Sequence, residues 1–213
     1  MYKKIIVFEG VDGTGKSYHI NQVAKFLKSK KIKFIKFREP GGSSNSEIIR
    51  KIILKNNSSL SKESDLLLYL AARKENYDKL IKPNLKKKII LIDRFVDSTL
   101  AYQHYGFNIN EKKIKYLNNF VIGNLKADYT FLHILPHKLL AKRIGGKKNK
   151  YDNYSKKFYE KVQNGFIKIL GKNKHKMIIK ADETKKFNEE KIINQIKKLL
   201  KIKWPNQTNK QSY

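Results

Sequence analysis

The sequence predicts an α/β protein with a five-stranded, mostly parallel sheet and helices on both faces. Two observations carry this prediction. Five short apolar, β-branched runs alternate with helix-like patterns along the 213 residues, and a glycine-rich segment directly follows the first run. Strands that alternate with helices pair in parallel through right-handed crossovers, so that helices bury both faces of the sheet.

The first half of the chain contains three predicted strands. Residues 4–8 are an apolar run that stops near a glycine, and residues 32–37 alternate apolar residues with lysine before the turn signal at residues 40–42. A helix is expected over residues 19–30, because Ile20, Val23 and Leu27 share one helical face. Helices are also expected over residues 48–54 and 65–81, and a third strand over residues 88–92.

The second half continues the alternation. A helix-prone stretch runs through residue 102, and helices are expected over residues 111–122, 158–170 and 191–202, with strands over residues 129–135 and 176–180. A helix over residues 138–143 breaks at two glycines, and the polar segment after it predicts an exposed loop over residues 144–154. No linker divides the chain, so residues 1–203 are predicted to form a single domain and residues 204–213 a polar tail.

Composition narrows the possible functions. The chain has 48 Lys and Arg against 18 Asp and Glu, a formal charge of +30, and no cysteine, which excludes disulfide frameworks and thiol-based metal or catalytic sites. The lysines are scattered and no nucleic-acid-binding motif accompanies them, so we expect no nucleic-acid partner. The early apolar run is too short for a signal peptide or a membrane span, so we expect no membrane partner and a cytoplasmic location.

Residues 10–17, GVDGTGKS, match the phosphate-binding P-loop pattern G-x-x-x-x-G-K-[ST]. The match lies between the first strand and the first helix, where backbone N–H groups and the helix N-terminus converge on a phosphate. Lys16 is expected to reach the β- and γ-phosphates of ATP, and the Ser17 hydroxyl to ligate Mg²⁺. The predicted nucleotide-binding residues are Gly10, Val11, Asp12, Gly13, Thr14, Gly15, Lys16 and Ser17.

A second nucleotide-binding motif is matched only by coincidence. Residues 149–152 fit N-K-x-D, the pattern with which GTPases read their base, but they follow glycines and lysines instead of a buried strand. No switch-type D-x-x-G occurs outside the P-loop. We therefore do not predict a GTPase.

Polar side chains gather where the predicted strands end. Asp93 closes the third strand and is placed to hold Mg²⁺ through water, with Arg94 beside it. Arg38 closes the second strand, and Tyr69 and Arg73 lie one helical turn apart on a following helix. Only five of the basic residues are arginines, so each marks a place where a planar guanidinium is needed. This cluster suits a second, anionic substrate that carries a ring.

Over residues 3–170 the sequence resembles the thymidylate kinases, the P-loop nucleoside monophosphate kinases that transfer the γ-phosphoryl group of ATP to dTMP. The resemblance rests on FEGVDGTGKS, REPGG, the LAAR helix that ends at Arg73, and DRFVDSTLAYQ over residues 93–103. It implies the P-loop NTPase architecture with a lid loop over residues 144–154, ATP as donor, Mg²⁺ as cofactor, and dTDP and ADP as products in dTTP biosynthesis.

The resemblance assigns roles to the residues around the acceptor phosphate and base. Asp12 holds the sugar 3′-OH of dTMP, while Arg38 and Arg94 clamp its phosphate. Tyr69 stands where the family usually stacks a phenylalanine on thymine, and Arg73 donates to the base.

The resemblance also implies how the sugar and the rest of the base are held. Thr99 and Gln103 line the base pocket, and Tyr102 crowds the 2′ position of the sugar. Arg50 is interpreted as a surface charge or a packing residue, with a weaker possibility that it approaches the base edge. The acceptor phosphate is largely dianionic at neutral pH, so no general base is required, and His133 and His137 are interpreted as structural.

Because position 13 of the P-loop is glycine, the chain resembles the bacterial type of thymidylate kinase, in which the lid supplies the catalytic cation. Lys150 stands where that type has an arginine, which keeps the charge and loses the bidentate geometry. The expected lid cation is Lys150, or Arg143 at the start of the lid. The resemblance further implies a homodimer, for which the apolar helix over residues 48–54 is a candidate contact surface.

Two alternatives remain open from the sequence. The first is a related kinase that acts on another nucleotide or on a nucleoside. It is tested by whether the acceptor must carry a 5′-phosphate and whether dUMP or UMP replaces dTMP. A basic nucleic-acid-binding ATPase would bind DNA in a salt-sensitive way and hydrolyse ATP faster in its presence.

Overall fold

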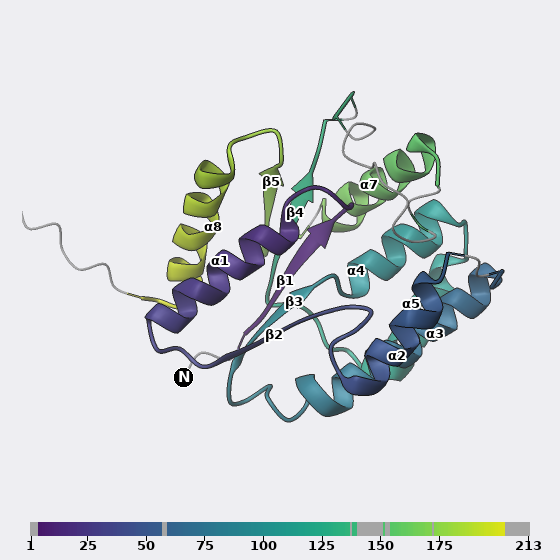
Figure 1. The fold of residues 1–213 in the computed structure, drawn as a ribbon, viewed down its shortest axis with the longest axis horizontal. Coiled ribbons are helices and arrows are strands. Elements are labelled where there is room, and N and C mark those ends of the chain that lie inside the picture. Colours follow the sequence, from purple (N-terminus) through teal and green to yellow (C-terminus); the bar gives the residue numbers. More distant parts are fainter. Residues whose placement is uncertain are drawn as a thin grey trace, which may run out of the picture.

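The computed structural model describes residues 4–56, 59–136, 138–139, 151, 154–171 and 173–202. Its centre is a five-stranded sheet of order β2-β3-β1-β4-β5 in which every neighbouring pair is parallel (Figure 1). The strands are β1 (Ile5–Gly10), β2 (Phe34–Arg38), β3 (Ile89–Asp93), β4 (Tyr129–Ile134) and β5 (Lys176–Lys180). The sheet confirms the predicted fold class.

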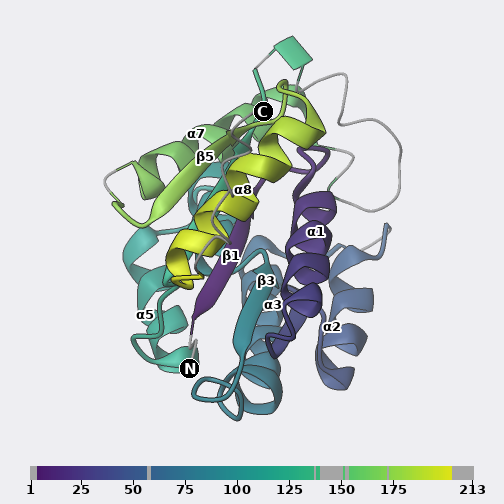
Figure 2. The same cartoon turned by 90° about the vertical axis from the view of Figure 1, so that its left-hand side faces the viewer.

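Helices cover both faces of this sheet. On one face lie α1 (Lys16–Ser29) and α8 (Lys185–Leu199), side by side in two perpendicular views (Figures 1 and 2). The other side carries α4 (Val96–Thr99), α5 (Glu111–Ile122) and α7 (Lys156–Leu170), and α3 (Lys62–Asn76) packs between α5 and α2 (Ser44–Leu54). Two wider, π-helical turns, η1 (Tyr77–Ile81) and η2 (Leu100–Gly106), continue α3 and α4.

The apolar strand residues divide between the two layers of helices. Ile6 and Phe8 of β1 pack in one cluster with side chains of α1 and α8, whereas Ile5 and Val7 pack in another with residues of η1 and α5. Adjacent strand residues point to opposite faces, so a strand covered on both sides needs an uninterrupted apolar run. This requirement explains why the inner strands β1 and β3 contain uninterrupted apolar runs, whereas the edge strand β2 includes exposed lysine and arginine.

Several helices begin earlier than predicted, and a side-chain cap accompanies the early start of α8 but not those of α1 and α2. Helix α8 starts at Lys185 instead of residue 191, where the Thr184 side chain accepts a hydrogen bond from the Phe187 N–H at 3.3 Å. Helix α2 starts at Ser44 instead of residue 48, and α1 starts inside the P-loop at Lys16 instead of residue 19.

Part of the predicted organisation falls outside the described residues. This applies to His137, to most of the helix over residues 138–143, to most of the predicted lid, and to the tail over residues 204–213. Within the part of the chain that is described, no helix has the length and apolar character needed to cross a bilayer.

Candidate active site

The P-loop leaves β1 so close to β4 that only glycine fits at position 10. Gly10 has φ of +131°, and a Cβ there would lie 2.2 Å from the carbonyl oxygen of His133. Lys16 is buried at the start of α1, and its Nζ donates to the Val11 carbonyl at 2.7 Å. Burial, together with repulsion from Arg94, lowers the pKa of Lys16 to about 8 against the attraction of Asp12.

Arg94 joins the P-loop to the strand beside it. Its backbone takes the left-handed conformation, with φ of 68°, directly after β3. Its Nη1 donates to the Gly10 carbonyl at 2.8 Å and its Nη2 to Asp12 Oδ1 at 2.7 Å. Burial alone would raise the pKa of Asp12, but the charges of Arg94 and Lys16 outweigh it and hold that pKa well below its usual range.

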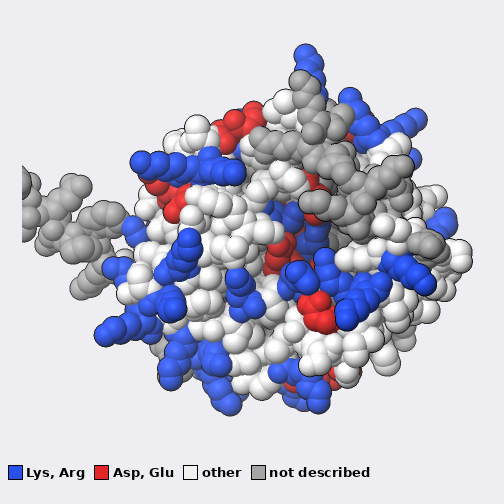
Figure 3. Space-filling model, in the orientation of Figure 1, with Lys and Arg blue, Asp and Glu red and all other residues white. Residues whose placement is uncertain are grey.

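Beside this ion pair lies a cavity of about 320 Å³. The space-filling view shows acidic and basic side chains together in a hollow near the centre of this face (Figure 3). Seven of the predicted acceptor-site residues line the cavity, and they come from the P-loop, α3, the end of β3, α4 and η2. They are Asp12, Tyr69, Arg73, Arg94, Thr99, Tyr102 and Gln103.

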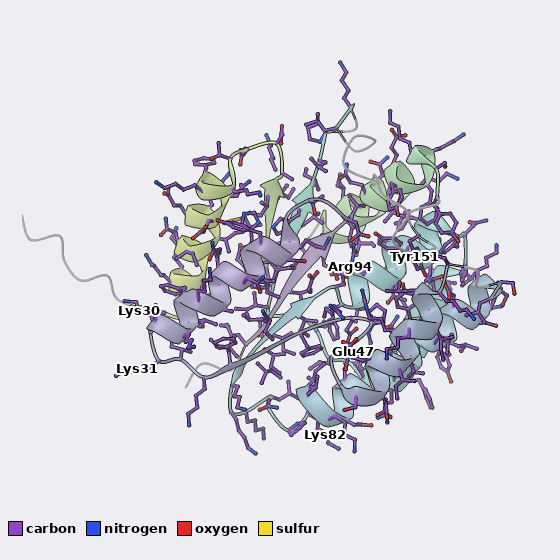
Figure 4. All side chains as sticks on the ribbon, viewed as in Figure 1. Lys30, Lys31, Glu47, Lys82, Arg94 and Tyr151 are labelled. Atoms are coloured by element: carbon purple, nitrogen blue, oxygen red, sulfur yellow. The ribbon has the colours of Figure 1, made fainter. Side chains whose placement is uncertain are left out.

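Arg38 does not line this cavity. Its side chain is 55% exposed, and its Nη2 pairs with Glu47 Oε2 at 3.2 Å. Glu47 in turn accepts the Gly42 N–H at 2.8 Å. Arg38 lies in an adjacent groove that also contains Ser17, Glu47 and Asp93. Figure 4 labels Glu47, which lies on α2, and Arg94, which follows β3.

Arg73 lines the cavity, but most of its N–H donors bond to acceptors of the protein. Its Nε pairs with Glu39 Oε2 at 2.8 Å, its Nη2 donates to the Phe95 carbonyl at 3.0 Å, and its Nη1 donates to Asn118. A guanidinium has five N–H donors, so at most two remain for a ligand. Burial raises the pKa of Glu39, and the attraction of Arg73 opposes that rise.

Arg50, interpreted as a surface charge or a packing residue, is partly exposed at the wall of the cavity. Arg50 lines the cavity, and its Nη1 donates to the Pro40 carbonyl at 2.6 Å. Arg50 lies in the second turn of α2, so its contact with Pro40 depends on how the helix packs against the turn and has no local sequence signal.

Two carboxyl groups near the site were missed, the fully buried Glu9 and the partly exposed Asp97. Glu9 accepts the N–H groups of Phe95 at 2.8 Å and Ser98 at 3.2 Å, as well as the Ser98 hydroxyl, and so caps α4. Burial, with the nearby charge of Asp97, raises the pKa of Glu9 to about 7. Burial also raises the pKa of Asp97 to about 6, against the attraction of Arg73. No local pattern indicates that a glutamate at the end of a strand caps a helix so far along the chain.

Tyr151 differs from the exposed loop expected around it. It is only 5% exposed, lines the cavity, and donates its hydroxyl to Asp65 Oδ2 at 2.7 Å. Asp65 was read only as part of a regular helix. The signal for Tyr151 was an aromatic residue inside a segment of otherwise polar residues.

His133 lies in β4 beneath the P-loop and outside the cavity lining. Its Nε2 is 2.9 Å from Nδ1 of His19, and the two rings stack with centroids 5.1 Å apart. Burial, with the charges of His19 and Lys16, lowers the pKa of His133 to about 3. A neutral, packed imidazole agrees with the structural interpretation of this residue.

The donor set near the P-loop fits a magnesium ion held together with nucleotide phosphates. The Ser17 hydroxyl donates to Asp93 Oδ2 at 3.1 Å, while Asp93 Oδ1 is buried without a hydrogen-bond partner among the described residues. Mg²⁺ is commonly bound by one or two carboxylates, water and substrate phosphates. The described residues include no group of three or more histidine and acidic side chains that would hold a metal.

Comparisons with known proteins agree on one family. The family model for thymidylate kinase matches residues 8–192. The chain is similar to the thymidylate kinase of Thermosipho africanus, at 40% identity over 77% of this chain and 83% of that protein. It is also similar to the thymidylate kinase of Prochlorococcus marinus strain AS9601, at 39% identity over 94% of this chain and 96% of that protein. The crystal structure of thymidylate kinase from Ehrlichia chaffeensis superposes with a TM-score of 0.75 at 32% identity, covering 91% of this chain and 98% of that one.

Proposed function

The chain belongs to the thymidylate kinase family, and from this premise we propose that its cavity binds dTMP while its P-loop binds the phosphates of ATP. The enzyme transfers the γ-phosphoryl group of ATP to dTMP, which yields dTDP and ADP in nucleotide biosynthesis. The family assignment does not favour a nucleoside kinase or a nucleic-acid-binding ATPase.

The observation that carries the placement of dTMP is the position of Arg94. Its guanidinium is held by Gly10 and Asp12 where the P-loop meets the cavity, and it keeps further N–H donors for an anion. A dTMP phosphate bound there faces the ATP phosphates on the P-loop. An oxygen of that phosphate forms the new bond to the γ-phosphorus, and ADP leaves with the electron pair of the broken bond.

Positioning and charge neutralisation account for this reaction. The second pKa of a phosphate monoester is about 6, so the attacking oxygen needs no general base. Lys16 and Arg94 neutralise charge on the two phosphate groups, and Asp12 orients Arg94 and the sugar hydroxyl. Arg38 lies in the adjacent groove, 3.2 Å from Glu47, from which its guanidinium must turn to assist Arg94.

The lining of the cavity offers unused polar atoms to the base and the sugar. Gln103 Oε1 and the Tyr102 hydroxyl are buried and have no hydrogen-bond partner among the described residues. Buried polar atoms are normally paired, so a ligand that supplies a donor and an acceptor is favoured there. Thymine and deoxyribose have such groups, and Tyr69 provides a ring for stacking.

Ser17 and Asp93 are the residues that would hold Mg²⁺. When bound, the ion neutralises charge on the β- and γ-phosphates. The identity of the lid cation remains a proposal, because Lys150 and Arg143 lie outside the described residues. If Lys150→Ala and Arg143→Ala both keep normal turnover, neither residue is that cation.

We also propose that the enzyme is a homodimer. Three neighbouring helices, α2, α3 and α5, carry large apolar side chains that are 47–80% exposed. These side chains are Ile48, Ile52, Leu67, Tyr116 and Phe120. Clustered exposed apolar residues favour a protein interface, and their position agrees with the contact surface expected from the helix over residues 48–54.

A coupled assay of ADP release across acceptors tests the proposed use of the cavity. With ATP and Mg²⁺, dTMP should be the best acceptor, dUMP and UMP should be poorer, and thymidine should give no turnover because it lacks the phosphate that Arg94 binds. Turnover of thymidine comparable to that of dTMP, or ADP release stimulated by added DNA, would contradict the proposal.

A further inference from the structure

Asp65 is a buried carboxylate that the proposed chemistry does not use. It is 3% exposed in the first turn of α3, and its Oδ2 accepts a hydrogen bond of 2.7 Å from the hydroxyl of Tyr151. Burying a carboxylate is costly unless strong hydrogen bonds compensate for the lost hydration. The contact joins a residue of α3 to one that lies 86 positions further along the chain.

A third residue extends this contact into the cavity. The Tyr69 ring meets the Tyr151 ring edge to face, with centroids 6.4 Å apart, and burial raises the pKa of both hydroxyls well above the usual range, so both keep their protons. A phenol has one proton to donate, and Tyr151 gives its proton to Asp65. Two residues of α3 therefore hold Tyr151: Asp65 through its hydrogen bond and Tyr69 through the ring contact.

Tyr151 is also held through its backbone. The hydroxyl of Tyr159, on α7, donates to the Tyr151 carbonyl at 2.7 Å. The Tyr151 ring then meets Tyr69 and Tyr102 edge to face, with centroids 6.4 and 6.0 Å away. Figure 4 labels Tyr151 and Arg94, which both line the cavity. Three tyrosine rings thus form one wall of the cavity, and Tyr151 is the member fixed from two helices.

We propose that Asp65 is a positioning residue for the acceptor nucleotide, which acts by holding Tyr151 as a fixed wall of the cavity. The inference rests on the proposed function, because it assumes that dTMP occupies this cavity. Asp65 and Tyr69 are four residues apart and share one face of α3, so the anchor of Tyr151 and the stacking ring form a single rigid unit. Disturbing that unit changes dTMP binding and leaves the ATP site on the P-loop intact.

A double-mutant cycle of Asp65→Ala and Tyr151→Phe tests the inference, because each variant removes the same hydrogen bond. Each single variant should raise KM for dTMP about tenfold, equivalent to about 1.4 kcal/mol, with kcat and KM for ATP within about twofold of the wild type. The double variant should bind dTMP no more weakly than either single variant. Asp65→Asn keeps a hydrogen-bond acceptor and should recover part of the affinity.

Glu63→Ala is the matched control, since it removes an exposed carboxylate from the same first turn of α3 and should leave every parameter unchanged. Calorimetric titration of dTMP, together with unfolding curves, confirms that each variant is folded. Multiplicative effects in the double variant, or a parallel rise of KM for ATP, would overturn the role of Asp65. A wild type that leaves dTMP unphosphorylated would instead contradict the proposed function.

Discussion

Arg94 concentrates three demands on one residue: a left-handed backbone, two hydrogen bonds to the P-loop and a place in the cavity lining. Its neighbour Asp12 keeps a low pKa because of this contact. The pKa of Asp12 therefore depends on Arg94, and the position of the Arg94 guanidinium depends on its bond to Asp12, so a substitution at either position affects both.

Arg94→Ala should lower kcat/KM for dTMP at least about 100-fold, because it removes donors aimed at the phosphate that reacts. Arg94→Lys keeps the charge but lacks the planar guanidinium, so its kcat/KM for dTMP should lie between those of Arg94→Ala and the wild type. Steady-state kinetics with varied dTMP measure the effect, with Lys30→Ala, at the C-cap of α1, as a control for loss of charge. Undiminished turnover by Arg94→Ala would remove Arg94 from the site.

Gly10→Ala should lower the free energy of unfolding by about 3 kcal/mol or more, because the new Cβ meets a backbone oxygen at 2.2 Å and the backbone is strained as well. Gly123→Ala separates the two effects. Gly123 also has a positive φ, of 62°, but its Cβ would meet nothing within 4 Å. Denaturant unfolding should therefore show a much smaller loss for Gly123→Ala, and equal losses would exclude the steric explanation.

Glu9 gives a pH dependence whose sign follows from its burial. Its pKa rises from 4.5 to about 7 in the folded protein, so folding favours the protonated form. The stabilisation is complete below pH 4.5 and is lost as the pH rises through about 7. As the pH rises from 4.5 through about 7, the free energy of unfolding of Glu9→Gln should fall less than that of the wild type. Parallel curves for the two proteins would show that Glu9 does not titrate in this way.

At the scale of whole elements, helix boundaries are set by caps that periodicity does not reveal. Residues 185–190 contain no apolar face, and Phe187 within them is half exposed, so the pattern alone placed the start of α8 too late. The wider turns of η1 and η2 each depend on packing between distant elements, which no local pattern encodes.

Thr184→Ala should lower the free energy of unfolding by about 1 kcal/mol, because the first turn of α8 loses its side-chain acceptor. Thr184→Ser retains the hydroxyl and is the matched control. Chemical denaturation of the three proteins measures the difference. Equal midpoints for Thr184→Ala and the wild type would show that solvent caps the helix equally well.

The difference between local patterns and distant contacts explains which site residues could be predicted. The P-loop, Asp93, Arg94, Tyr69 and Arg73 are set by motifs, by strand ends or by helical spacing, and the structure gathers them at one edge of the sheet. Glu9, Asp65 and Tyr151 contribute through partners 86 or more positions away. Their local surroundings resemble an ordinary strand, helix and loop, so only tertiary structure identifies them.

At the scale of the whole molecule, parallel strands direct their carboxyl ends to one edge, which brings residues from β1, β2 and β3 together. The net charge acts at the same scale. Two chains of +30 repel each other, so the apolar helices α2, α3 and α5 must overcome this repulsion for a dimer to form.

Dimerisation should therefore strengthen with salt, which screens repulsion and leaves apolar contact intact. Analytical ultracentrifugation should give a higher dimer fraction in roughly 0.3 M than in roughly 0.05 M salt. Ile52→Asp should yield monomers, whereas Ile178→Asp, which alters an exposed isoleucine on the edge strand β5, should not. A monomeric wild type at both salt concentrations would contradict the proposed dimer.

The left-handed backbone of Arg94 also bears on attempts to evolve the enzyme for heat resistance. A non-glycine residue in this conformation costs about 1–2 kcal/mol, and glycine avoids that cost. Arg94→Gly would also remove the ion pair with Asp12, whose loss offsets this gain, and arginine and glycine codons differ by one nucleotide. Because the two effects oppose each other, survival on heating is a poor measure of the loss of Arg94, so a screen for heat resistance must score product formation alongside thermal tolerance.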